Sequence, residues 1–100
     1  MPTDIHVICP HKLNWRRIEG NVFESEDWRV ATRTAEEART SGGRFYLHEH
    51  KADPAWHGGS ITEWILVPES GRLIFRYVMD GPFRVRCREG WSQSMAIVRS

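Results

Sequence analysis

The spacing of apolar and polar residues predicts that β-strands dominate this chain. Residues 44–49 (RFYLHE) alternate, which should place Tyr46 and His48 together on one face of a strand, opposite an apolar face. Strands are also expected over residues 5–9, 60–67, 72–79, 83–88 and 94–98, with a short extended piece at 21–24. The second half of the chain should therefore form an antiparallel meander.

One stretch has the spacing typical of a helix, residues 32–39 (TRTAEEAR). Thr34 and Glu37 stand three positions apart, as in a capping box. Residues 41–43 (SGG) should end this helix. A short helical turn is also expected at residues 14–17.

Proline, glycine and aspartate mark the connections. Residues 68–71 (PESG) predict a turn, Asp80-Gly81 predicts a two-residue hairpin, and residues 50–59 should form a loop. Strands in this number with one or two short helices predict an α+β fold, a small, mainly antiparallel curved sheet or pseudo-barrel. The length of 100 residues suits a single domain over residues 1–100.

The composition is that of a globular protein, 40% hydrophobic and 27% charged. The longest uncharged apolar run, residues 64–68, is too short to span a bilayer, so no membrane contact is expected. The first residues lack the features of a signal peptide, which favours a cytoplasmic protein. Cys9 and Cys87 suit that compartment as reduced thiols.

The net charge of +1 gives no general attraction to nucleic acid, but the positive charge is unevenly distributed. Residues 71–100 carry six arginines and two acidic residues, whereas residues 1–70 carry eight basic and eleven acidic residues. Arginine suits phosphate and carboxylate recognition. Codon usage explains the preference equally well, because the whole chain has 12 arginines and two lysines.

The predicted strand 83–88 (FRVRCR) carries three arginines on its outward face. Steps of about 7 Å, from a rise of ~3.3 Å per residue, would space Arg84, Arg86 and Arg88 much as phosphates are spaced along a single nucleic-acid strand. With Arg76 on the neighbouring strand, they are candidate phosphate-binding residues. The alternative is a solvated face whose charges prevent edge-to-edge aggregation.

The stretch WHGG, residues 56–59, is the candidate ligand loop. Trp56 adjoins Gly58-Gly59, where bare backbone lets a ligand approach closely, and an exposed tryptophan can stack on a base. His57 lies beside it. The alternative is a plain turn into the next strand.

The histidines and cysteines give weaker signals. They lack the paired cysteines of structural zinc sites, so neither a metal nor a cofactor is expected. A further alternative is a small enzyme or metal protein built on His48, Glu49, His50 and His57, with acid–base chemistry by Glu49. No P-loop or metalloprotease motif occurs, so we expect no catalytic residues and favour a non-enzymatic protein, with the question of an enzyme left open.

Residues 27–50 resemble the central part of PUA-like domains, the EVE and ASCH families in particular. The shared order is a tryptophan (Trp28), a short helix, a strand opened by glycine (GRFYLH, residues 43–48), and a second strand that begins GSITE at residue 59. An opening strand at residues 5–10 also matches.

The resemblance implies a pseudo-barrel with a pocket for a base of RNA or DNA, often modified or flipped out of its helix. The residues implied to line it are Trp28, Arg29, Tyr46, His48, Trp56, His57, Gly58 and Gly59. We therefore expect a domain that binds nucleic acid or a modified nucleobase. The alternative is a small protein-binding module, such as an adaptor or an inhibitor, because tryptophan and arginine dominate many interfaces.

Overall fold

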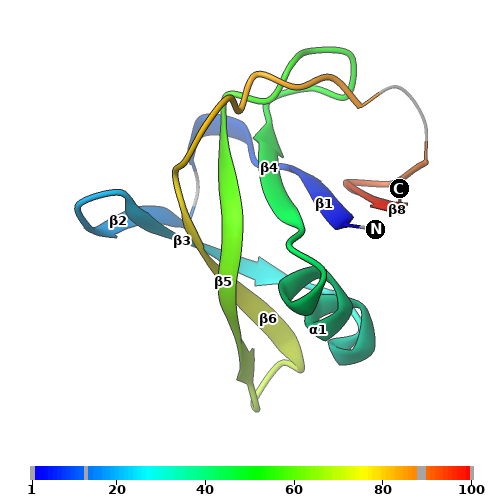
Figure 1. The fold of residues 1–100 in the computed structure, drawn as a ribbon. Coiled ribbons are helices and arrows are strands. Elements are labelled where there is room, and N and C mark those ends of the chain that lie inside the picture. Colours follow the sequence, from blue (N-terminus) through cyan, green and yellow to red (C-terminus); the bar gives the residue numbers. More distant parts are fainter. Residues whose placement is uncertain (1, 13, 88–89, 100) are drawn as a thin grey trace.

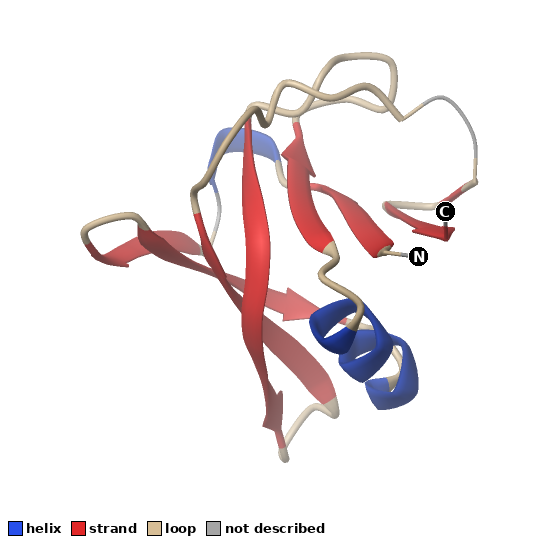
Figure 2. Cartoon of the chain, in the orientation of Figure 1, coloured by secondary structure: helices blue, strands red, loops and turns tan. Residues whose placement is uncertain are grey.

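The computed structural model describes residues 2–12, 14–87 and 90–99, which form one curved sheet with a single α-helix against it (Figure 1, Figure 2). In chain order the elements are β1 (Thr3–Ile8), the 3-10 turn η1 (Pro10–Lys12), β2 (Trp15–Glu19), β3 (Val22–Trp28), α1 (Thr32–Thr40), β4 (Arg44–His48), β5 (His57–Val67), β6 (Arg72–Val78), β7 (Trp91–Ser92) and β8 (Met95–Arg99). The strands lie in the order β2-β3-β6-β5-β4-β1-β8-β7. The β1–β4 pair is parallel and the other pairs are antiparallel. The predicted α+β class with a mainly antiparallel curved sheet is confirmed.

The main core lies between one face of the sheet and α1. Its largest wholly buried side chains include Phe45 on β4 and Phe75 and Tyr77 on β6, and the rings of Phe45 and Phe75 stack with centroids 5.0 Å apart. Ala35 and Ala38 of α1 are also fully buried, and their small side chains let the helix approach the sheet closely. The alternation along β4 and β6 therefore predicted their core faces correctly.

The expected hairpin at Asp80-Gly81 does not form, and the strand expected at residues 83–88 is absent over the described residues 83–87. Residues 79–87, called here the crossing segment, form no strand and pass over the ends of β5 and β4 (Figure 1). The cause is the Asp80 carboxylate, which accepts hydrogen bonds from the Ser60 backbone N–H and hydroxyl and from the Arg44 guanidinium. Arg44 also donates to the carbonyls of Asp80 and Pro82. These bonds hold the chain over the sheet when β6 ends.

The crossing segment then packs against residues 49–56. The Ala55 backbone N–H donates to the Val85 carbonyl (2.9 Å), and the Arg86 guanidinium donates to the Ala52 carbonyl (2.8 Å). The crossing segment therefore packs over one end of the sheet, which the sequence prediction did not anticipate. Strand β4 is buried on both faces. Cys87 is buried, as predicted, although it lies outside any strand.

Two local predictions near the start of the chain are also wrong. Residues 15–19 form β2 instead of a helical turn, because Trp15 stacks on Phe23 of β3 and holds the chain extended (centroids 5.2 Å apart). The capping box does not form, since α1 begins at Thr32 and Glu37 bonds instead to the Thr3 hydroxyl and to Arg99. Among the described helices, none is long and apolar enough to cross a bilayer.

Gly58 and Gly59 lie inside β5, not in a loop. A Cβ on Gly58 would stand 2.6 Å from the Phe45 carbonyl oxygen, and one on Gly59 would stand 1.9 Å from that of Val78. Both glycines are therefore required by close strand-to-strand packing. Their backbone is covered by protein and offers no bare surface to a ligand, which corrects their expected role in binding.

This packing predicts a large effect of Gly59→Ala on stability. The added methyl group would overlap the Val78 carbonyl, so we expect a loss of more than about 3 kcal/mol of unfolding free energy, or failure to fold. The matched control is Gly81→Ala, at φ +63° with no atom near the new Cβ. Backbone strain there should cost only about 1 kcal/mol. Equal losses in denaturant unfolding of the two variants would contradict this account.

Candidate binding site at the aromatic end of the sheet

Six rings from five parts of the chain meet at one end of the sheet. They belong to Trp15, Phe23, Trp56, His57, Tyr77 and Phe83, and they are called here the aromatic cluster. Trp56 stands edge-on to Trp15 (centroids 5.1 Å, 82°), and Phe83 of the crossing segment lies 5.2 Å from the His57 ring. Trp56 thus belongs to a rigid assembly of rings and not to a loose loop.

A buried hydrogen-bond chain fixes the floor of the cluster. The Trp15 indole N–H donates to the Tyr77 hydroxyl oxygen (2.7 Å), and that hydroxyl lies 2.7 Å from His57 Nδ1. Burial, together with the positive charge of Lys12, lowers the pKa of His57, so its ring is neutral at pH 7. His57 is therefore a packed residue beneath Trp56 rather than an exposed ligand group.

A hollow of about 580 Å³ opens beside the cluster and is lined by His11, Lys12, Glu49 and Trp56. The Lys12 ammonium lies 5.6 Å from the centroid of the Trp15 ring and 5.8 Å from that of Trp56, within range of a cation–π interaction with both. The Trp56 indole N–H donates to the Cys9 carbonyl (3.2 Å), which fixes the plane of the ring. The hollow therefore combines an oriented aromatic ring, a cation and a carboxylate.

The backbone that carries the hollow's basic side is strained. His11, Lys12 and Asn14 have φ angles of 57°, 56° and 56°, in the left-handed region that residues with a side chain rarely adopt. The His11 backbone N–H donates to Glu49 Oε2 (3.3 Å) and so joins this turn to the far wall. Such strain persists where the surroundings enforce it, often at binding sites. The sequence carried no signal for Lys12 or Trp15, because neither lies near Trp56 along the chain.

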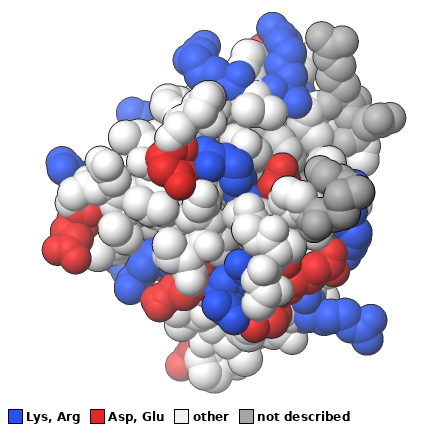
Figure 3. All heavy atoms as spheres, viewed as in Figure 1, with Lys and Arg blue, Asp and Glu red and all other residues white. Residues whose placement is uncertain are grey.

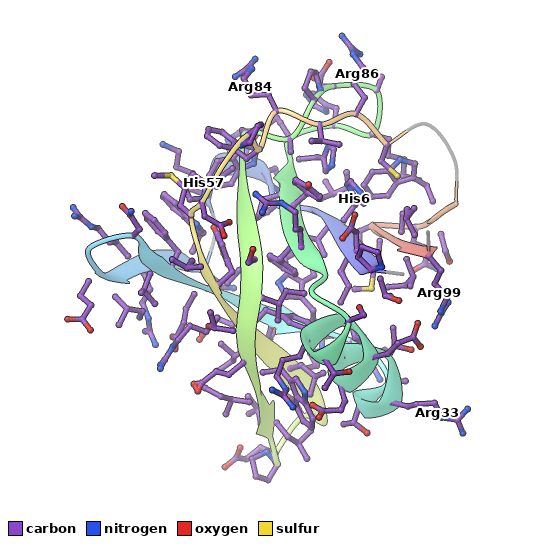
Figure 4. The ribbon with its side chains drawn as sticks, in the orientation of Figure 1. His6, Arg33, His57, Arg84, Arg86 and Arg99 are labelled. Carbon is purple, nitrogen blue, oxygen red and sulfur yellow. The ribbon has the colours of Figure 1, made fainter. Side chains whose placement is uncertain are left out.

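The surroundings of the hollow are basic. The segments at this end contribute Lys12, Lys51, Arg84 and Arg86, against the carboxylates of Glu49 and Asp53, while Asp80 is paired with Arg44. Figure 4 shows Arg84 and Arg86 projecting outward from the crossing segment, and Figure 3 shows basic side chains exposed at the same end. In the described part of the chain neither arginine pairs with a carboxylate. Arg88 lies outside the described residues.

Arg76 has a different environment. Its guanidinium pairs with the buried carboxylate of Glu24 and, at 3.3 Å, with that of Glu63. Arg16 also pairs with Glu24 (2.7 Å). A phosphate at Arg76 would have to compete with two carboxylates, so the structure does not present it as an available cation.

Tyr46 packs against His6, and His48 packs against His6 and Trp91; neither lines the hollow. His48 Nδ1 lies 2.9 Å from the Asp53 carbonyl and must donate to it, because a carbonyl oxygen can only accept. The other ring nitrogen of the neutral His48, Nε2, therefore accepts a hydrogen bond from His6 Nδ1 (2.8 Å). The His6 ring stacks on Tyr46 with centroids 4.7 Å apart. Burial, and secondarily the nearby His48, lower the pKa of His6 to about 4, so this pair is neutral at pH 7 and structural.

Trp28 and Arg29 line a second hollow, of about 560 Å³, between the end of β3 and the β7–β8 turn. Arg72, Met95 and Ile97 are among the other residues that line it. The Trp28 indole N–H donates to the Ser25 hydroxyl (3.0 Å). The single pocket expected from the resemblance is therefore divided: Trp56 borders one hollow, and Trp28 with Arg29 borders another.

The histidine group proposed for catalysis is dispersed. His48 bonds to His6, His57 to Tyr77, and His50 is exposed. Over residues 2–12, 14–87 and 90–99, no three histidine, cysteine or acidic residues gather in a way that could hold a metal ion.

Comparison with known proteins gives no family model, no curated protein and no solved structure that matches the chain.

The buried histidine pair predicts a pH-dependent stability. In the folded chain His6 has a pKa of about 4, below its ordinary 6.5, so near pH 5 the unfolded chain binds a proton that the folded chain does not. Stability should be complete above the ordinary value and fall by up to about 3 kcal/mol as the pH drops toward the folded value.

Urea unfolding at about pH 7.5 and about pH 5 measures this loss. His6→Gln keeps a donor for His48 but does not titrate, so it should reduce the difference between the two pH values. The control, His50→Gln, changes an exposed histidine and should leave the difference intact. An unchanged difference in His6→Gln would show that other groups cause it.

Proposed function

We propose that this protein is a non-enzymatic domain that binds single-stranded nucleic acid or nucleotides, with one base stacked on Trp56 in the hollow. The observation that carries this proposal is the oriented Trp56 ring at the wall of a hollow that also presents the Lys12 ammonium. Aromatic stacking contributes about 1–3 kcal/mol per base and suits a ring held in place beforehand. Here the Cys9 carbonyl and Trp15 hold it.

Lys12 has two roles in this proposal. In the free chain its ammonium shields the faces of Trp15 and Trp56. A base that stacks on Trp56 displaces the ammonium toward the edge of the base or toward a phosphate, where it remains a hydrogen-bond donor. The energy of the cation–π contact is thus exchanged for stacking plus a charge-assisted hydrogen bond.

Arg84 and Arg86 supply the phosphate contacts. They flank Val85, whose carbonyl binds the N–H of Ala55, the residue before Trp56. Arg86 is partly held by its bond to the Ala52 carbonyl, which reduces the entropy it would lose on binding a phosphate. A strand with a base at Trp56 can therefore pass its backbone along the crossing segment.

The curved sheet is further proposed to be a PUA-like pseudo-barrel. In the strand order, β3 lies near one edge of the sheet and the β7–β8 turn lies at the other edge, yet residues of both line the hollow at Trp28. That proximity supports a nearly closed sheet. A second base, or a modified one, would bind in the hollow that Trp28 and Arg29 line.

Stacking on Trp56 is tested by titrating the protein with a short single-stranded oligonucleotide at low salt. We expect binding to quench tryptophan emission, and Trp56→Ala to weaken binding roughly tenfold or more. Lys12→Ala should weaken it less, because it removes one donor. Arg33→Ala, on α1 and far from Arg84 and Arg86 in Figure 4, is the matched control. Wild-type affinity in a folded Trp56→Ala variant, as judged by circular dichroism, would disprove the stacking site.

The phosphate contacts are tested by salt dependence. Each phosphate contact to a single strand contributes about 0.7 to the slope of log affinity against log salt, so the double variant Arg84→Ala/Arg86→Ala should flatten it by roughly 1.4. Arg33→Ala should leave the slope unchanged. A slope that is the same in the double variant and the wild type would rule these arginines out as phosphate ligands.

Exposed apolar residues favour a second candidate, a protein-binding module. Ile65 and Leu66 near the end of β5 are 38% and 46% exposed, and Ile18 on β2 is 39% exposed. Contiguous patches of exposed apolar side chains often mark a protein contact. In that case a partner should cross-link near residues 65–66, and oligonucleotides should not quench Trp56.

A further inference from the structure

The hollow's polar groups indicate which base it takes. Resting on the proposed base-binding function, we infer that the base stacked on Trp56 is guanine, read at its Watson–Crick edge by the Glu49 carboxylate and the Lys12 ammonium. The guanine can belong to a free nucleotide or to a single strand, since both present the same ring.

Glu49 is an acceptor held in place and left available. The His11 N–H contacts its Oε2 through one long hydrogen bond (3.3 Å), and no lysine or arginine nitrogen among the described residues lies within ion-pair distance of it. Glu24, Glu37 and Asp80, by contrast, each pair with an arginine. A carboxylate has room for about four hydrogen bonds. Glu49 can therefore accept two more from a ligand.

The negative charge of Glu49 changes the pKa of a neighbouring group, the Cys9 thiol. Burial is the main cause that raises the pKa of the Cys9 thiol to about 11, and the negative charge of Glu49 is the second cause. Cys9 is also the residue whose carbonyl orients the Trp56 indole. The carboxylate therefore acts on the same small region in which the base is proposed to stack.

Guanine alone among the common bases complements this pair of groups. Its N1–H and N2–H donors lie side by side and match the two oxygens of a carboxylate, and the neighbouring O6 accepts from an ammonium. Adenine and cytosine each place a ring-nitrogen acceptor beside their amino group, which a carboxylate repels. Uracil and thymine offer one N–H between two carbonyls. A site built on two donors discriminates strongly against rings that lack them.

The experiment compares the mononucleotides of guanine, hypoxanthine, adenine, cytosine and uracil, by quenching of tryptophan emission and by calorimetry. Hypoxanthine differs from guanine only in lacking the N2 amino group. We expect guanine to bind at least roughly tenfold more tightly than adenine, with hypoxanthine between them, since hydrogen bonds to a charged group are the stronger kind. Single-stranded oligonucleotides of one length, with a single guanine or a single adenine, form the second arm and separate a strand from a free nucleotide as the source.

Glu49→Gln is the decisive variant. Its amide oxygen can still accept from His11, so the turn should stay folded, but the side chain no longer accepts two donors. The guanine preference should disappear, while adenine affinity stays the same or rises. Glu69→Gln, an exposed residue in the β5–β6 turn, is the matched control and should keep the preference.

The outcomes separate this inference from the proposed function. Equal binding of all bases by the wild type, with loss in Trp56→Ala, would overturn the guanine assignment and leave the stacking site standing. A guanine preference that survives Glu49→Gln would also overturn it. Absence of binding by every nucleotide and oligonucleotide would overturn the proposed function itself.

Discussion

The position of the Asp80 carboxylate determines much of the rest of this structure. It receives hydrogen bonds from Ser60 and Arg44 where β6 ends, and although partial burial raises its pKa, these bonds outweigh that effect and lower it. The chain is thereby held over the sheet and cannot turn back as a hairpin. An Asp-Gly pair favours a tight turn locally. Here the donors that converge on the carboxylate override that preference.

The crossing segment then has two effects. It packs against residues 52–55, whose Asp53 carbonyl accepts from His48, beside a layer in which His6 bonds to His48 and stacks on Tyr46. It also brings Phe83 onto His57 and places Arg84 and Arg86 next to the residue that precedes Trp56. The Asp80–Arg44 ion pair thus links the packing of the sheet with the side chains presented at the surface.

The candidate site depends on fixed aromatic rings at its base and on two charged groups at its opening, Glu49 and Lys12, that form no ion pair among the described residues. Trp15 and His57 both hydrogen-bond to the Tyr77 hydroxyl, and Trp15 packs edge-on against Trp56, which restricts reorientation of the Trp56 ring. Glu24, Glu37, Glu63 and Asp80 are each paired with an arginine, whereas Glu49 has no such partner in the described chain. Lys12 contacts ring faces rather than a carboxylate. A planar ring with donors and acceptors on one edge is the ligand that we propose for this site.

The sequence by itself determined what depends on neighbours along the chain: the helix at 32–39, most of the strands, and the core alternation of β4 and β6. Trp56 also stands out in the sequence, as an aromatic residue near proline and glycine, and in the structure it lines the hollow. Only the tertiary structure decided that Gly58 and Gly59 are packing residues, that Arg84 and Arg86 lie outside a strand, and that Lys12, Glu49 and Trp56 share one hollow. Those outcomes depend on contacts between residues far apart in sequence, such as Asp80 with Arg44 and Trp15 with Tyr77, and local periodicity carries no information about such contacts.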